Sequence, residues 1–259
     1  MGDAHHEYDD QFVAGLEWMW GNGFLSPGGP EEVAAILEGI DLAGKTVLDI
    51  GSGIGGIDLL LVKKHGAKKV IGIDVEAPLI ARSNEMVRKA GLTAEQIEFR
   101  LVEPGPLPFE NQSFDLVFSK DSMIHIPNKQ AIYADIYRVL KPNGRLAFSD
   151  WFGSEAPSTP EFEEWLRVVG LTFKMGTIDT AVSLLHEIGF INVEAIDRNQ
   201  WYAQNILEEL ATLDGENYDR LVTQEGEPFA KQRLKSSSLK KQVVDQGLLR
   251  PGHIRGIRP

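Results

Sequence analysis

The amino-acid sequence predicts an α/β fold in which helices cover both faces of a doubly wound, mostly parallel sheet. Two observations point to this class. Between residues 46 and 150, short runs rich in β-branched and aromatic residues alternate with stretches that place apolar residues at helical spacing. A glycine-rich segment, VLDIGSGIGG, begins inside the first of these runs. Such alternation is typical of parallel sheets with right-handed crossovers.

The elements are expected in the following order. An aromatic-rich N-terminal segment, residues 8–30, contains a predicted helix at 10–20 and ends in the turn SPGGP. Core strands are predicted at 46–50, 69–74, 98–102, 114–119 and 145–150. Helices are predicted between them at 54–65, 77–91 and 127–140, and apolar residues share one face of the last. Later helices are predicted at 160–169, 177–189 and 201–213, with strands at 190–196 and 252–258 and a flexible break at SSS, 236–238.

Composition and charge exclude several kinds of protein. The 259 residues contain no cysteine, which rules out disulfides, thiolate zinc sites and cysteine nucleophiles. No apolar run is long enough to span a membrane, and MGDAHHEYDD is too acidic for a signal peptide, so we expect a soluble, cytoplasmic protein. His5 and His6 lack partners at metal-ligand spacing, so no metal site is expected.

The net charge of −12 is distributed unevenly along the chain. It disfavours nucleic acids and anionic membranes as partners. Residues 231–259, the C-terminal basic segment, hold eight Lys or Arg against Asp245 alone, a balance of +7, so the first 230 residues carry −19. A basic tail of this kind is either a solvated end or a lid over an anionic ligand.

The glycine-rich segment predicts a ligand site at the carboxyl ends of the strands. Gly51, Gly53 and Gly56 fit the spacing of a dinucleotide-binding turn, and Asp74 lies 23 residues after Gly51, where it could hold ribose hydroxyls. Asp49 argues against a dinucleotide, because a carboxylate there would repel a pyrophosphate. It favours a cofactor that presents positive charge beside the turn. Glu103, predicted to end the third strand, is placed to meet an adenine amino group.

At these residues the chain resembles the class I S-adenosylmethionine-dependent methyltransferases, which share a Rossmann-like core. The match includes VLDIGSGIGG, VIGID, FDLVFS and VLKPNGRLAFSD (139–150). S-adenosylmethionine carries a sulfonium and an ammonium, which suit Asp49. The resemblance implies that this cofactor contacts Asp49, Gly51, Ser52, Gly53, Asp74 and Glu103 and leaves as S-adenosylhomocysteine. A nicotinamide-linked enzyme and a cofactor-binding module without turnover are the alternatives.

Outside the core, WGNGFLSPGG (20–29) and FSKDSMIHI (118–126) look like the phosphoethanolamine N-methyltransferases. That resemblance implies a catalytic dyad of Tyr8 and His125, with Asp121 holding the acceptor amine. It also implies cofactor contacts from residues beside the strand ends and in the N-terminal segment: Leu25, Ser26, Val75, Pro104, Ser119 and Lys120. The core would span residues 31–150, with a lid segment at 1–30 and substrate-side helices, final strands and the basic tail at 151–259, all in one domain.

The chemistry of methyl transfer fits these residue types. An ammonium has no lone pair, so it must lose a proton before or during attack. His125 could accept that proton, with Tyr8 orienting the ring, while Asp121 stabilises the positive product. Trp18, Trp20, Phe24 and Trp151 could offer aromatic faces to a methylated ammonium. The alternatives are a core histidine, a helix cap at Asp121 and tryptophans that only pack.

The resemblance is weakest where the family binds phosphate. Trp151 stands where the family has a tyrosine, and its arginine and second tyrosine are not evident in 165–175. Lys240 aligns with the family's lysine. Either Arg167, Lys174 and Lys240 rebuild the clamp, or the acceptor is a different small amine. The alternative role for Lys240 is a solvated charge. We therefore expect methyl transfer to the nitrogen of a small polar amine, phosphoethanolamine-like as the leading candidate, with an amino-acid-like amine or an oxygen or sulfur nucleophile as alternatives.

Overall fold

The computed structural model describes residues 8–171 and 173–259. Within these ranges a seven-stranded sheet has the order β3-β2-β1-β4-β5-β7-β6. Strands β1 to β5 are parallel, and β7 runs antiparallel between β5 and β6. The strands are β1 Thr46–Ile50, β2 Lys69–Asp74, β3 Ile97–Leu101, β4 Phe114–Lys120, β5 Leu140–Gly153, β6 Ile191–Asp197 and β7 Leu249–Ile257.

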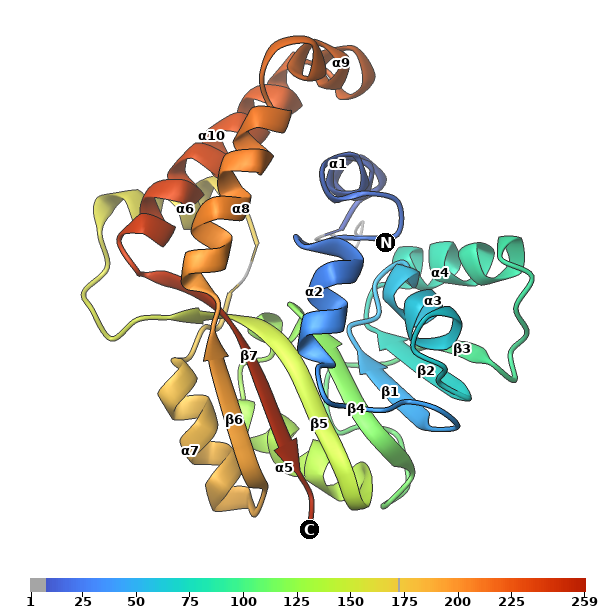
Figure 1. Cartoon of the computed structure of the whole chain (residues 1–259). Helices are drawn as coiled ribbons and strands as arrows, with labels where there is room; N and C mark the ends of the chain where they lie inside the picture. The colour runs from blue at the N-terminus through green and yellow to red at the C-terminus, as the bar shows by residue number, and fades with distance from the viewer. Residues whose placement is uncertain (1–7, 172) are drawn as a thin grey trace, which may run out of the picture.

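Helices cover both faces of this sheet (Figure 1), which confirms the predicted doubly wound fold. Side chains alternate along β1: Val47 packs on one face, whereas Leu48 and Ile50 pack on the other. The face of Val47 is covered by α2 (Gly29–Ile36), α3 (Gly56–Lys63) and α4 (Ala77–Lys89). The opposite face is covered by α5 (Lys129–Val139) and α7 (Ile178–Ile188).

A second group of helices stands above the carboxyl ends of the strands, and we call it the upper helical layer (Figure 1). It consists of α1 (Asp10–Trp20), α6 (Pro160–Val169), α8 (Asn199–Thr212), α9 (Gly215–Glu225) and α10 (Glu227–Asp245). Helices α6, α8 and α10 share an apolar cluster that includes Trp165, Tyr202 and Val243. In the part of the chain described, no helix is long and apolar enough to cross a bilayer.

Helix α10 corrects one sequence prediction. The three serines at 236–238, expected to be a flexible break, lie inside a helix of 19 residues. Serine is only mildly unfavourable in helices, and packing decides the outcome. Ser236 and Ser237 are buried, and the Ser237 hydroxyl donates to Glu209 of α8 at 2.7 Å. The adjoining helix α9 was also absent from the prediction.

The C-terminal basic segment is not a tail. Its last part forms β7, which hydrogen-bonds to β5 on one side and β6 on the other. The strand begins three residues earlier than predicted. Two of its cations bind helix ends: Arg255 donates to the Ile36 carbonyl at 2.9 Å, and Arg258 to the Tyr137 carbonyl at 2.9 Å. Cationic donors satisfy the last carbonyls of a helix and oppose its dipole.

Candidate active site

The turn between β1 and α3, which we call the cofactor turn, has the backbone conformation that a cofactor site requires. Gly51 and Gly53 adopt left-handed conformations, with φ of +74° and +54°. A Cβ on Gly51 would lie 2.2 Å from the Ser122 Cβ, so only glycine fits. The Gly53 amide donates to Asp74 at 2.9 Å, which ties this turn to the end of β2.

Asp49 projects from β1 beneath this turn and is almost fully buried. Neither carboxylate oxygen has a hydrogen-bond partner among the described residues. Burial raises the pKa of Asp49, and the neighbouring Asp58 and Asp74 raise it further. A buried carboxylate without a partner is costly, so the site is complementary to a cationic ligand. The ammonium and sulfonium of S-adenosylmethionine meet that requirement, and the residues present therefore fit this cofactor.

The predicted adenosine contacts lie at the ends of β2 and β3. Asp74 accepts hydrogen bonds from the amides of Gly53 and Glu76, so its carboxylate braces the turn. The side chain of Val75 is half exposed, at 52%, and is therefore accessible to a ligand. Glu103 was expected to end the third strand, but β3 ends at Leu101. Glu103 and Pro104 are exposed in the loop that follows.

Two residues at the end of β4, Ser119 and Lys120, form hydrogen bonds with neighbouring segments. The Lys120 ammonium is buried and donates to the Ser26 hydroxyl and to the Pro27 carbonyl. Leu25 lies against Gly53, with its Cδ1 3.0 Å from where a Cβ would stand. The Ser119 hydroxyl donates to the Ile50 carbonyl at 2.8 Å. Ser119 thus braces the end of β1 next to the turn, and Lys120 holds the N-terminal segment. The hydroxyl of buried Ser52 has no partner within the described ranges.

Asp121 follows β4 in a left-handed conformation, with φ of +56°. Its carboxylate accepts hydrogen bonds from the Ser149 hydroxyl and the Lys120 ammonium, each at 2.7 Å. It lines the cavity described below and does not cap α5, because Asn128 performs that role. A carboxylate has about four acceptor positions, so Asp121 retains capacity for an amine. Non-glycine residues in this strained conformation cluster at functional sites.

Tyr8 and His125, which are 117 positions apart in the chain, meet in the fold. The Tyr8 hydroxyl lies 3.4 Å from His125 Nε2. His125 ends a short 3-10 helix, η1 (Met123–His125), whose Ile124 amide donates to Asp150 at 3.0 Å. Burial raises the pKa of Asp150 to about 7. Sequence analysis missed Asp150, although its place at the end of a predicted strand was a usable signal.

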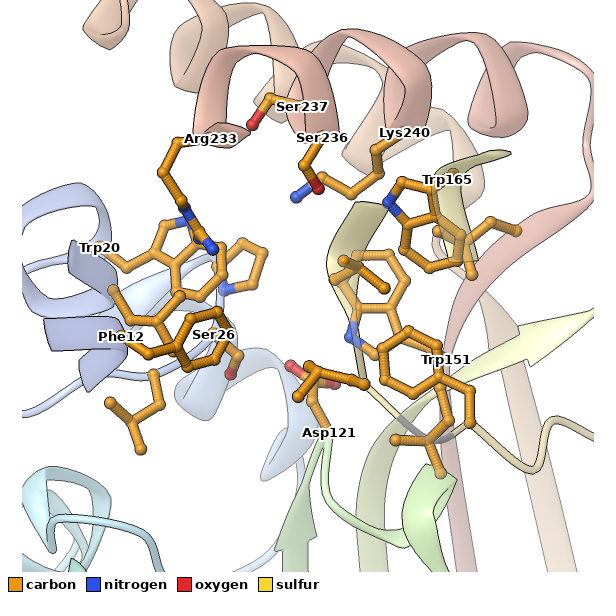
Figure 2. Close-up of a pocket in the computed structure, with 18 of the residues that line it drawn as sticks. Phe12, Trp20, Ser26, Asp121, Trp151, Trp165, Arg233, Ser236, Ser237 and Lys240 are labelled. Carbon is orange, nitrogen blue, oxygen red and sulfur yellow. The ribbon is translucent and has the colours of Figure 1, made fainter. Parts of the chain in front are cut away.

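A cavity of about 90 Å³ lies between Asp121 on one side and side chains of α1, α6 and α10 in the upper helical layer on the other (Figure 2). One water needs roughly 10–15 Å³ on the same measure, so the cavity suits a small molecule. Its lining includes Tyr8, His125 and Asp121, together with Leu25, Ser26, Trp151 and Lys240. These predicted residues come from five separate parts of the chain.

Two of the aromatic residues proposed for the acceptor lie elsewhere. Trp18 packs against Leu213 and Leu221 under α9, and Phe24 packs into the sheet core. Trp18 and Trp20 are two positions apart on α1 and so point to different sides of the helix. Trp20 lines the cavity, and so does Trp165, which sequence analysis did not single out.

The cations also differ from the proposed clamp. Arg167 is exposed and pairs with Glu164 at 2.7 Å, and Lys174 is exposed outside the cavity lining. Lys240 is not a solvated charge: it is buried and pairs with Glu209 at 2.8 Å. The other cavity-lining cation is Arg233, which sequence analysis missed because its approach depends on how α10 packs.

The described residues contain no group of three or more His, Asp or Glu side chains that could hold a metal ion. His5 and His6 lie outside these residues. The candidate site consists of the glycine turn, the Tyr8–His125 pair, Asp121 and a cavity lined by residues of α1, α6 and α10.

Comparison with known proteins identifies a family and several similar proteins. A family model described as "Methyltransferase domain" matches residues 41–226. Phosphoethanolamine N-methyltransferase 1 of Arabidopsis thaliana is 30% identical over 211 residues, which cover 81% of this chain and 42% of that protein. Phosphoethanolamine N-methyltransferase of Plasmodium falciparum is 30% identical over 204 residues, covering 77% and 74%. This chain spans less than half the length of the plant relatives it matches.

A solved structure shares the fold. Phosphoethanolamine N-methyltransferase 2 of Haemonchus contortus, in complex with phosphomonomethylethanolamine and S-adenosylhomocysteine, has a TM-score of 0.91. It is 24% identical, and the match covers 98% of this chain and 59% of that one. The sheet order and this neighbour show the class I methyltransferase fold. The chain belongs to the methyltransferase-domain family.

Proposed function

We propose that this protein transfers a methyl group from S-adenosylmethionine to the nitrogen of a small polar amine, phosphoethanolamine-like in structure. The observation that carries the proposal is the convergence of Tyr8, His125 and Asp121 on a small cavity beside the cofactor turn. The names of the relatives support the choice of acceptor, since three of them are phosphoethanolamine N-methyltransferases.

Each residue at the site has a separate role in the proposed reaction. S-adenosylmethionine supplies an electrophilic methyl group on its sulfonium. Asp121 holds the acceptor's amine and stabilises the positive charge that grows there. His125 accepts the proton that the ammonium must lose, and Tyr8 orients the imidazole by a hydrogen bond. Trp20, Trp151 and Trp165 exclude water and offer faces to the methylated ammonium. Alignment of the nitrogen with the methyl group supplies the remaining rate advantage.

Product detection tests this proposal. The protein is incubated with S-adenosylmethionine and, separately, phosphoethanolamine, ethanolamine, glycine, and simple hydroxyl and thiol acceptors. Mass spectrometry then follows the methylated product and S-adenosylhomocysteine. We expect N-methylation of at least one amine. Methylation of only oxygen or sulfur acceptors would contradict the proposal, and tight cofactor binding without any S-adenosylhomocysteine would indicate a binding module without turnover.

A further inference from the structure

Arg233 is a buried cation with no ion-pair partner among the described residues. Its side chain lines the cavity, only 9% of the residue is exposed, and its Nε has no hydrogen-bond partner in that part of the chain. In the ranges that the structure describes, Arg233 forms no ion pair; its guanidinium lies over the rings of Phe12 and Phe229 at 5.2 and 5.9 Å. Burial lowers the pKa of Arg233, as expected where a charge is removed from water without full compensation.

The other buried cations at this site are already paired. Lys120 pairs with Asp121 at 2.7 Å, and Lys240 pairs with Glu209 at 2.8 Å. Glu209 also accepts hydrogen bonds from Tyr202 and Ser237, so its oxygens are fully engaged with α8 and α10. Its lowered pKa reflects these donors, which outweigh the effect of burial. The charge of Arg233 therefore remains for a ligand to neutralise.

The cavity has two ends of opposite character (Figure 2). Arg233, Ser236 and Lys240 descend into it from one face of α10, at positions i, i+3 and i+7, and Asp121 rises from the opposite side. A guanidinium presents a planar fork of N–H donors that suits the oxygens of a carboxylate or phosphate. Ser236 stands beside it with a further hydroxyl donor. Asp121, although paired with Lys120, still offers carboxylate acceptor positions, so the cavity provides acceptors for an amine at one end and a cationic donor for an oxyanion at the other.

We propose that Arg233, with Ser236 beside it, binds an oxyanion of the methyl acceptor and thereby selects amines that carry a phosphate or carboxylate group. This inference rests on the proposed function for the amine end of the acceptor. The anion-binding role of Arg233 is a property of the cavity and can be tested without turnover. Lys240 contributes through its positive charge while it remains paired with Glu209.

The kinetic experiment compares wild type with Arg233→Gln and Arg233→Lys on phosphoethanolamine, β-alanine and ethanolamine. Arg167→Gln is the matched control, because it removes an exposed arginine of the same helical layer. We expect Arg233→Gln to lower kcat/KM for an anionic acceptor relative to ethanolamine by roughly 10- to 100-fold, mainly through KM. Arg233→Lys should lower this kcat/KM less than Arg233→Gln does, because lysine keeps the positive charge but lacks the planar guanidinium with its parallel N–H donors. Whichever anionic acceptor the wild type prefers identifies the oxyanion.

The binding experiment titrates inorganic phosphate or acetate into each variant in the presence of S-adenosylhomocysteine, followed by calorimetry and tryptophan fluorescence. We expect wild type and Arg167→Gln to bind at least one of the two anions and Arg233→Gln to bind it at least tenfold more weakly. If the anion binds as expected but no methylated product forms, the anion-binding role of Arg233 is supported and the proposed methyl transfer is contradicted. Equal losses for all three acceptors, or anion binding independent of Arg233, would overturn the inference and leave Arg233 a packing role. Should Arg233→Gln fail to fold, Arg233→Lys decides: a loss of kcat/KM for the anionic acceptors relative to ethanolamine supports the inference, and equal losses for all three acceptors overturn it.

Discussion

At the scale of single residues, the cofactor turn is flanked by three buried acidic side chains: Asp49, Asp58 and Asp74. Burial raises the pKa of all three. Asp58 is completely inaccessible, neither of its oxygens has a partner within the described residues, and its pKa rises to about 8. The turn is therefore built to meet positive charge, and without a ligand its stability depends on pH.

Replacement of Asp58 by Asn should reduce that dependence. Because the pKa of Asp58 is higher in the folded state than its ordinary value near 4, the folded protein binds more protons there between pH 4 and pH 8. Its free energy of unfolding should then fall as the pH rises through this window, by up to about 4 kcal/mol from pH 5 to pH 8. Urea unfolding of the ligand-free protein at both pH values should show a smaller fall for Asp58→Asn. The exposed Asp219→Asn variant serves as control, and a slope equal to wild type in Asp58→Asn would refute the argument.

The dyad gives a second prediction at this scale. His125→Ala should keep wild-type affinity for S-adenosylhomocysteine, because Asp49 and the glycine turn are untouched, and should lower kcat by about 100-fold or more. Tyr8→Phe keeps the ring but removes the hydroxyl that lies 3.4 Å from the imidazole, so a smaller loss is expected. Calorimetry measures the affinity, and the pH–rate profile reports the proton transfer. An unchanged rate and profile in His125→Ala would exclude the dyad.

At the scale of elements, a buried ion pair joins α8 to α10. Lys240 of α10 lies between the rings of Trp20 and Tyr202, and Glu209 of α8 neutralises it. The apolar cluster shared with Trp165 holds the same helices together. The upper helical layer thus combines an ordinary core with a charged contact that directs α10 toward the cavity.

Removal of Glu209 should therefore destabilise the protein strongly. Glu209→Ala leaves Lys240 buried without a counter-charge, and such changes cost about 3–5 kcal/mol. Denaturant unfolding should show this loss, whereas the double variant Glu209→Gln, Lys240→Met should recover much of it, because no buried charge remains. Breaking the exposed pair of Lys231 with Glu227 should change stability by less than about 1 kcal/mol and is the comparison. A mild effect of Glu209→Ala would mean that Lys240 reaches solvent when unpaired.

At the scale of the whole molecule, the C-terminal basic segment is part of the framework. It supplies α10, and then β7 enters the sheet between β5 and β6. Its cations are distributed to separate tasks: Arg233 and Lys240 face the cavity, while Arg255 and Arg258 bind helix carbonyls. Basic residues that cluster in the sequence therefore lie at different places in the fold, some at the cavity and some at the ends of helices.

Deletion of residues 249–259 should prevent folding. β7 is the hydrogen-bonded partner of two strands, so its loss would strip β6 from the sheet and expose an edge of β5. Far-UV circular dichroism and limited proteolysis should show a largely unfolded product. The double variant Lys231→Gln, Lys241→Gln lowers the positive charge of the same segment at exposed sites and should stay folded. A folded, cofactor-binding truncation would contradict this role for β7.

The sequence by itself determined the α/β core, most element boundaries within it, and the cofactor turn with Asp49 and Asp74. These depend on local periodicity and on residue types at short spacing, which the chain displays directly. Only the tertiary structure decided which distant residues meet: Tyr8 with His125, Lys240 with Glu209, and Arg233 with the cavity. It also made a helix of the serine-rich segment and inserted the predicted final strand between β5 and β6. Those outcomes depend on which face of each helix finds apolar partners and on where an antiparallel strand inserts, and neither is encoded in local pattern.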